Sequence, residues 1–369
     1  MEDLHKAIDA QQKAIDNLQK QLDAVTSIIE NSEIQNPAPA SAKVSGSRSQ
    51  SGGETSIGGY GELHYNNLDS KKELDFSRFV LYFSHRFSDT IRLHSELELE
   101  HSVASNKDPG EVALEQAYVD FDLNDRNTVR AGLFLVPVGI INETHEPPTF
   151  YGVERNPVET YIIPSTWWEG GGGLNGELAA GWNYDVTVTS GLNVLISGVD
   201  AFEVRDGKQE VATAKADNPA YTARLRWTGM AGIELSGTLN YQDDITQGTQ
   251  GVSATLVEGH AVINQGAFGL RALYATWNLD GSAPKAIGRD EQFGWYIEPS
   301  YKITPKIGVF ARYNEWDNTA GDRVDSKATE TSFGINYWPH ENVVLKADIQ
   351  QQGGVVGDDG FNLGIGYQF

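Results

Sequence analysis

The stretch that decides the fold is the last one of the chain, Phe361-Asn-Leu-Gly-Ile-Gly-Tyr-Gln-Phe369. Side chains alternate between the two faces of a strand, so its apolar residues share one face and Asn, Gly and Gln share the other. An apolar stripe that ends in an aromatic residue is typical of a strand that faces lipid and ends in an interfacial aromatic girdle. The edge strand of a soluble sandwich is the alternative, and repetition of the pattern decides between the two.

The alternation repeats from Thr55 to Phe369 in sixteen segments. For example, Leu225 and Trp227 oppose Arg224 and Arg226. Short connections between segments alternate with long ones, which is typical of outer-membrane barrels and has no reason in a soluble sandwich. We therefore predict an all-β fold, a 16-stranded antiparallel transmembrane β-barrel over residues 55–369. An even strand number brings both termini to the side of the short turns, the periplasm of a bacterial outer membrane.

Composition excludes several other classes of protein. The 369 residues include no run near the ~18 apolar residues that a membrane helix needs. A net charge of -23 argues against a nucleic-acid partner, which requires clustered Lys and Arg. The eight His residues are scattered, no G-x-S-x-G is present, and no His, Asp or Glu cluster has metal-ligand spacing. We expect no enzymatic activity, no cofactor and no metal.

The first thirty residues carry heptads. Apolar residues recur at the a and d positions, which predicts a helix over residues 1–30 that pairs with partner helices as a coiled coil. A flexible linker, 31–54, follows. We expect a homotrimer, and the alternative is an amphipathic helix docked on its own domain. The residues expected to hold the trimer together are Ile8, Gln11, Ile15, Leu18, Leu22 and Val25.

The longest connection, 137–173, is the candidate pore loop. It is too apolar for a disordered segment in water, so we expect it to fold inward against the barrel wall and narrow the pore. An extracellular lid or a trimer latch is the alternative. Its predicted selectivity residues are Glu143, Glu146, Glu154, Arg155 and Glu159.

Strand alternation also places basic and acidic side chains on the lumen wall. Basic wall residues that face acidic loop residues would create a transverse field across a water-filled constriction. For any one basic residue, a salt bridge to a lumen neighbour is an equal alternative. The basic residues predicted to line the pore are Arg78, Arg92, Arg130, Arg224, Arg226, Arg312 and Lys346.

Several motifs resemble the phosphate-selective porin O and P family. They are Arg130-Ala-Gly-Leu-Phe-Leu-Val-Pro-Val-Gly139, Glu146-Pro-Pro, Gly152-Val-Glu-Arg155, Glu115-Gln-Ala-Tyr-Val-Asp-Phe121 and the C-terminal Gly364-Ile-Gly-Tyr-Gln-Phe369. The N-terminal heptads are similar to those of coiled-coil porins associated with dicarboxylate uptake. The resemblance implies a trimeric sixteen-stranded outer-membrane porin whose third loop constricts the pore. Phosphate-selective members carry many Lys and Arg along the pore, whereas this lumen is mixed, so no phosphate site is transferred.

The predicted function is a passive diffusion channel for small hydrophilic solutes, with an anion preference at the wall formed by Arg78, Arg92 and Arg130. Its expected partners are further copies of itself, outer-membrane lipid and lipopolysaccharide. The alternative function is a barrel anchor whose coiled coil tethers the membrane to peptidoglycan or to a periplasmic protein.

Overall fold

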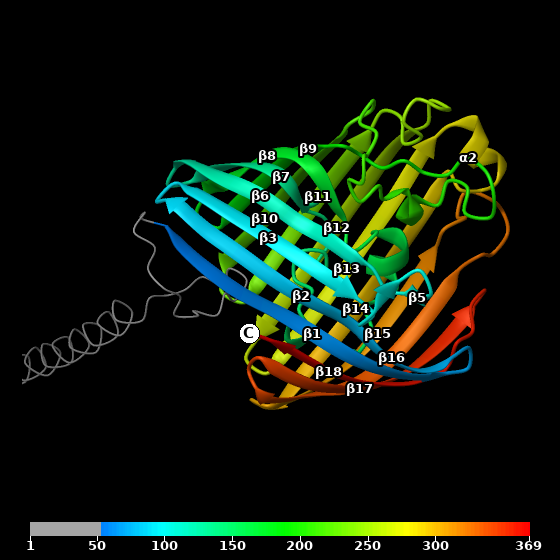
Figure 1. Ribbon diagram of the computed structural model, residues 1–369. Coiled ribbons are helices and arrows are strands. Elements are labelled where there is room, and N and C mark those ends of the chain that lie inside the picture. The colour runs from blue at the N-terminus through cyan, green and yellow to red at the C-terminus, as the bar shows by residue number, and fades with distance from the viewer. Residues whose placement is uncertain (1–52) are drawn as a thin grey trace, which may run out of the picture. The chain divides into compact units, whose positions relative to one another are not determined.

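Residues 53–369 form a closed antiparallel β-barrel in the computed structural model, which describes this part of the chain (Figure 1). Its sixteen strands confirm the predicted number. Each barrel strand pairs with the one before it, and β18 closes the ring against β1. The strands are β1 (Glu54–Leu68), β2 (Lys72–Ser88), β3 (Ile91–Glu100), β6 (Val112–Asn124), β7 (Asn127–Leu135), β8 (Trp168–Ala179), β9 (Trp182–Thr189), β10 (Ala220–Met230), β11 (Ile233–Gln242), β12 (Ser253–Gln265), β13 (Phe268–Asp280), β14 (Glu291–Thr304), β15 (Ile307–Asp317), β16 (Ala328–His340), β17 (Val343–Gly354) and β18 (Gly360–Gln368).

The C-terminal strand closes the barrel as its alternation predicts. Leu63 lies opposite Ile365, and the backbones of Gly59 and Phe369 exchange two hydrogen bonds. Closure satisfies the backbone groups that an open sheet edge would leave unpaired, which a membrane requires. Phe369 therefore lies at the end of the barrel that carries the short turns.

The two faces of the wall have opposite chemistry. On β16, Phe333 is 51% exposed on the outer face, whereas its neighbour Ser332 on the inner face is 2% exposed. Apolar side chains are exposed in the same way on the outer face of the other strands, among them Leu225, Ile297 and Leu363. An apolar exterior around a polar interior is the arrangement of a barrel that is solvated by lipid.

Three connections have features that the sequence pattern did not show. The connection between β1 and β2 is only residues 69–71, because Asn66 and Asn67 continue the ladder with Glu73 and Lys72. The connection between β3 and β6 contains a small hairpin, β4 (Ala104–Ser105) with β5 (Asp108–Pro109), which was not predicted.

The third correction concerns the pore loop, which spans 136–167 and not 137–173. Its predicted C-terminal part, including the run of four glycines, belongs to β8 and pairs with both β7 and β9. Glycine usually interrupts strands, but here close neighbours take the space of a side chain. A Cβ on Gly173 would lie 2.8 Å from Cγ2 of Thr187.

Among the described residues, two long loops pack together in one apolar core. Val158, Ile162 and Trp167 from the pore loop pack with Leu192 and Phe202 from the loop 190–219. The core also includes wall residues from β12 to β14, chiefly Leu256, Trp277 and Tyr296. The short helices of the described chain are η1 (Pro147–Thr149), η2 (Val158–Ile162), η3 (Val204–Gly207) and α2 (Ser282–Ala286).

The predicted coiled coil, 1–30, and all but the end of the predicted linker, 31–54, lie outside the described residues. β1 begins at Glu54, one residue before the predicted start of the barrel. Between residues 53 and 369 no helix has the length and apolar character needed to cross a membrane.

Candidate functional site: the loop inside the barrel

The segment 148–153 of the pore loop lies against the inner wall. Its backbone accepts hydrogen bonds from wall side chains that sit on different strands. Arg271 donates to Thr149 O at 2.8 Å, Asn336 to Phe150 O at 3.1 Å and Trp338 to Pro148 O at 3.2 Å. In return, Val153 N donates to the Asp348 carboxylate at 2.6 Å. Because these donors and acceptors come from the lumen face of β13, β16 and β17, the loop is held within the barrel.

Glu159 fastens the next part of the loop, and it has no exposed surface. Its Oε1 accepts hydrogen bonds from the backbone N–H groups of Ile140 and Ile141 at 2.6 and 2.7 Å. Its Oε2 accepts hydrogen bonds from Asn156 Nδ2 at 2.9 Å and from the Tyr296 hydroxyl at 2.8 Å. A carboxylate with four donors is fully satisfied. Glu159 therefore joins two parts of the loop to β14 and offers no free oxygen to a solute.

Two other loop carboxylates also bind the wall. Glu143 forms an ion pair with Arg224. Glu154 accepts a hydrogen bond from Asn66 at 2.9 Å and lies 3.1 Å from His64 Nδ1. Burial opposes ionisation of Glu154, but the contacts with His64 and Asn66 outweigh it and lower the pKa of Glu154 to about 2.

The remaining predicted loop residues contact their surroundings more weakly. The Tyr82 hydroxyl donates to Glu146 at 3.4 Å. Arg155 donates to the Thr166 hydroxyl, within the loop, at 2.9 Å. The predicted loop residues are therefore spread along its contact with the wall.

The predicted arginines of the lumen wall all lie within ion-pair distance of a carboxylate. The pairs are Arg78 with Glu62 and Glu98, Arg92 with Asp122, Arg130 with Asp120, Arg224 with Asp185 and Glu143, Arg226 with Glu234, and Arg312 with Glu298 and Glu330. The salt-bridge alternative therefore describes these arginines. Only the Arg224–Glu143 pair, among those just named, joins a basic wall residue to an acidic loop residue. Lys346 differs, because its Nζ lies 3.5 Å from the centre of the Phe150 ring.

A cavity of about 500 Å³ lies under the loop at the end of the barrel that carries the short turns. Its loop side consists of residues 148–151, and its wall side includes Arg271, Lys302 and Lys306. Thus the basic side chains Lys302 and Lys306, which the strand pattern did not single out, border the space next to the loop.

Further residues that position the site were not predicted. Asp244, in the connection after β11, accepts hydrogen bonds from the backbone N–H groups of Thr246, Gly248, Gly251 and Val252. Ile245 and Val252 from this folded connection join the core that holds both long loops. A single Asp before a polar, Gly-containing stretch is a common turn signal, so its position in the chain does not connect it with the pore loop.

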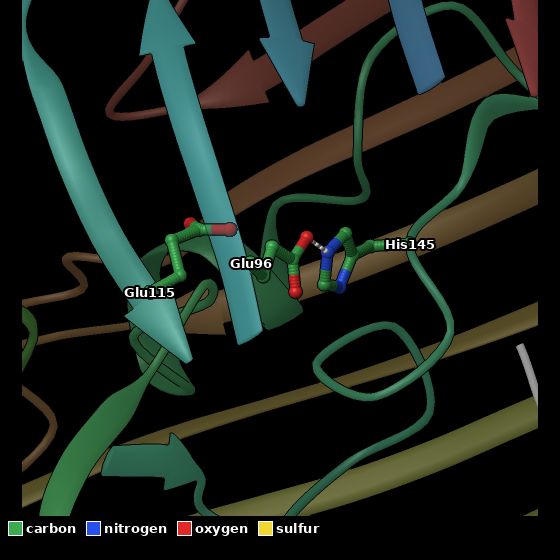
Figure 2. Close-up of side chains that lie close together, drawn as sticks. All are labelled: Glu96, Glu115 and His145. Carbon is green, nitrogen blue, oxygen red and sulfur yellow. Dashed lines mark hydrogen bonds and ion pairs between the residues drawn. The ribbon is translucent and has the colours of Figure 1, made fainter. Parts of the chain in front are cut away.

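A second unpredicted feature involves His145 of the pore loop and two wall residues. Glu96 on β3, Glu115 on β6 and His145 on the loop place one ligand atom each within 4.8 Å of one another (Figure 2). All three side chains are buried. Their positions in the sequence have no metal-ligand spacing, because three separate segments contribute them.

The barrel sequence matches a family model. Residues 57–350 match the model described as phosphate-selective porin O and P. The chain belongs to this family. This confirms the resemblance seen in the motifs and makes the barrel an outer-membrane porin. An uncharacterized protein of Aquifex aeolicus (strain VF5) is 32% identical in an alignment of 335 positions that covers 79% of this chain and 74% of that protein.

Solved structures share the fold of this porin. The anion-selective porin from Comamonas acidovorans superposes with a TM-score of 0.62 at 14% identity, covering 86% of this chain and 100% of that chain. The outer-membrane channel DcaP of Acinetobacter baumannii gives 0.59 at 15% identity, over 88% and 100%. The trimer form of OmpT from Vibrio cholerae gives 0.59 at 11% identity, over 86% and 99%. At these identities the likeness concerns the barrel fold alone.

Proposed function

We propose that this porin is a passive diffusion channel for small hydrophilic solutes and that the loop 136–167 narrows its pore. One observation carries the proposal. The loop is bonded to lumen side chains of at least seven strands, β1, β2, β10, β13, β14, β16 and β17, by hydrogen bonds that use its backbone and its carboxylates. A loop that is attached at so many points keeps the cross-section of the pore constant. A channel that separates solutes by size needs a constant cross-section, whereas an external lid does not.

We further propose that the channel has little preference for anions. An arginine within reach of a carboxylate contributes a short-range dipole rather than a net positive field, because the two charges cancel beyond their separation. The pairs of the lumen wall, from Arg78–Glu62 to Arg312–Glu298, are all of this kind. An anion filter at Arg78, Arg92 and Arg130 would need these guanidinium groups unpaired, as they are not here.

The assembly and orientation are part of the same proposal. The heptads of residues 1–30 support self-association into a trimer through Ile8, Ile15 and Leu22, with the segment and both termini in the periplasm. A tether to the cell wall through this segment is the alternative. Removal of residues 1–30 separates the two. Monomeric channels would support assembly, whereas intact trimers combined with a weakened envelope would support tethering.

The experiment that tests the channel is a planar-bilayer recording of the purified protein, with the reversal potential measured across a salt gradient. We expect conductance in steps and a reversal potential close to zero or on the cation-selective side. A protein that inserts without conductance would contradict a channel, and a strongly anion-selective reversal potential would contradict the neutralised wall. A loop that sieves solutes also predicts that neutral sugars enter protein-containing liposomes more slowly as their size increases.

A further inference from the structure

The cluster of Glu96, Glu115 and His145 contains a buried carboxylate for which the described residues supply no partner. Glu115 has 0% of its surface exposed, and neither of its oxygens has a hydrogen-bond partner. An ionised carboxylate in such a place is costly unless a cation or a proton compensates it. The guanidinium of Arg78 forms its ion pairs with Glu62 and Glu98, and no ion pair to Glu115 is found among the described residues. The charge of the Glu115 carboxylate therefore requires a cation or a proton that the ion pairs of the described residues do not supply.

A β-bulge is the reason that Glu115 points inward. Glu96 pairs with Gln116, and the next residue of β3, Leu97, pairs with Leu114, so Glu115 is an extra residue in β6. Leu114 is exposed on the outer face, while Glu115 is buried. Without the bulge, strict alternation would put Glu115 on the face of Ala117, toward lipid. Bulges commonly redirect a side chain in this way next to functional sites.

The histidine is oriented for a ligand. His145 Nδ1 lies 3.1 Å from the carbonyl oxygen of Asn142, which can only accept, so Nδ1 carries the proton that it donates. Nε2 then faces Glu96 Oε1 at 3.4 Å. A ring whose far nitrogen donates to a backbone carbonyl while the near nitrogen meets carboxylates is the usual arrangement of a metal-binding histidine.

The Nε2–Oε1 distance also fits a bridging ion. Two ligands bound at about 2.1 Å to a tetrahedral zinc lie about 3.4 Å apart, whereas a charge-assisted N–H···O bond is usually about 2.8 Å. Glu96 is itself held in place, because Gln116 Nε2 donates to its Oε2 at 2.5 Å. In Figure 2 the Glu115 carboxyl group and the His145 ring lie on either side of the Glu96 carboxylate.

We propose that Glu96, Glu115 and His145 form a binding site for a divalent cation of the zinc class, which fastens the start of the pore loop to β3 and β6. One imidazole and two carboxylates are a ligand set that Zn²⁺ accepts, and a fourth position remains for water or a solute group. The two carboxylates and the ion neutralise one another, which removes the cost of burying Glu115. The proposal rests on the barrel and the position of the loop, and it does not require that the protein conduct.

The test uses the full-length protein, folded in detergent and stripped with EDTA. Isothermal titration with Zn²⁺ should show one tight site per chain, and Glu115→Gln and His145→Gln should each weaken it at least about 100-fold. His94→Gln is the matched control, because His94 lies on the same strand as Glu96 but outside the cluster, stacked on Tyr118. It should leave the tight site unchanged. Heat-modified migration on gels verifies that each variant is folded.

Three results would overturn the proposal. The first is the absence of a tight site in the wild-type protein, which would mean that a proton accompanies Glu115. The second is zinc binding that Glu115→Gln and His145→Gln retain, as expected if Zn²⁺ binds only exposed acidic side chains such as Asp200 and Asp206. The third is a zinc complex of the wild-type protein without an imidazole ligand, which is measured if the variants fail to fold. X-ray absorption of the wild-type zinc complex must then show imidazole and oxygen ligands, and a spectrum without imidazole rejects the site.

Discussion

The Tyr296 hydroxyl allows the attachment of the pore loop to be measured one hydrogen bond at a time. Tyr296 lies on β14 and donates to Glu159 Oε2 at 2.8 Å, and both side chains are buried. The variant Tyr296→Phe removes this donor and keeps the ring. A hydrogen bond to a charged group contributes about 1.5–3 kcal/mol. Since every 1.4 kcal/mol is a factor of about ten, the detached state of the loop should become roughly 10- to 100-fold more populated.

Removal of the carboxylate should have a larger effect. Glu159→Ala leaves the N–H groups of Ile140 and Ile141, Asn156 Nδ2 and the Tyr296 hydroxyl without their acceptor. Each buried group without a partner costs about 1–3 kcal/mol, so at least about 4 kcal/mol of loop attachment is expected to be lost. The order of severity is therefore Glu159→Ala, then Tyr296→Phe, then wild type.

The assay is single-channel recording in planar bilayers, in which a detached loop produces extra conductance levels and open-channel noise. Tyr274→Phe is the control, because Tyr274 is on the outer face of β13 and 47% exposed. A double variant, Glu159→Gln with Tyr296→Phe, tests whether the two residues act through one bond, since coupled residues give less than additive effects. Recordings of Tyr296→Phe and Glu159→Ala that match those of Tyr274→Phe would refute the assignment of Glu159 as the fastening of the loop.

Three further predictions concern two other carboxylates of the loop and the lipid face of the barrel. Glu143→Gln should leave Arg224 with Asp185 as its only acidic partner and shift the reversal potential toward anion selectivity by a few millivolts. The conservative variant Glu143→Asp should shift it less. Equal reversal potentials in wild type and Glu143→Gln would show that the pair lies away from the solute path. The pKa of Glu154 is lowered from 4.5 to about 2, so its ionised form contributes to loop attachment fully above pH 4.5 and is lost only as the pH falls through about 2. Channel noise should therefore be the same at pH 7 and pH 5 in wild type, with Glu154→Gln noisier at both, and a wild-type transition between pH 5 and pH 7 would contradict this. Ile335 lies on the lipid face of β16, so Ile335→Arg should destabilise the folded barrel by about 2–4 kcal/mol. Urea titration of the protein in liposomes measures this, with Ile335→Leu as the control. Equal unfolding midpoints for the two variants would place this face outside the membrane.

The sequence alone determined the barrel, its strand number and the faces of its strands. The reason is local and repetitive. Each strand, such as Phe361–Phe369, must present apolar side chains to lipid and polar ones to the lumen, so period-two alternation records the environment residue by residue. The inward position of Arg78, Arg224 and Arg312 follows from the same parity.

Only the tertiary structure decided how these side chains meet. The partner of Arg224 is Glu143 because the loop passes that point of the wall, and no spacing in the sequence encodes this path. The four glycines read as the end of the loop but form part of β8, since pairing with two neighbouring strands outweighs the low strand propensity of glycine. Glu115 faces inward because one extra residue in β6 reverses the alternation, and a register shift exists only between two paired strands.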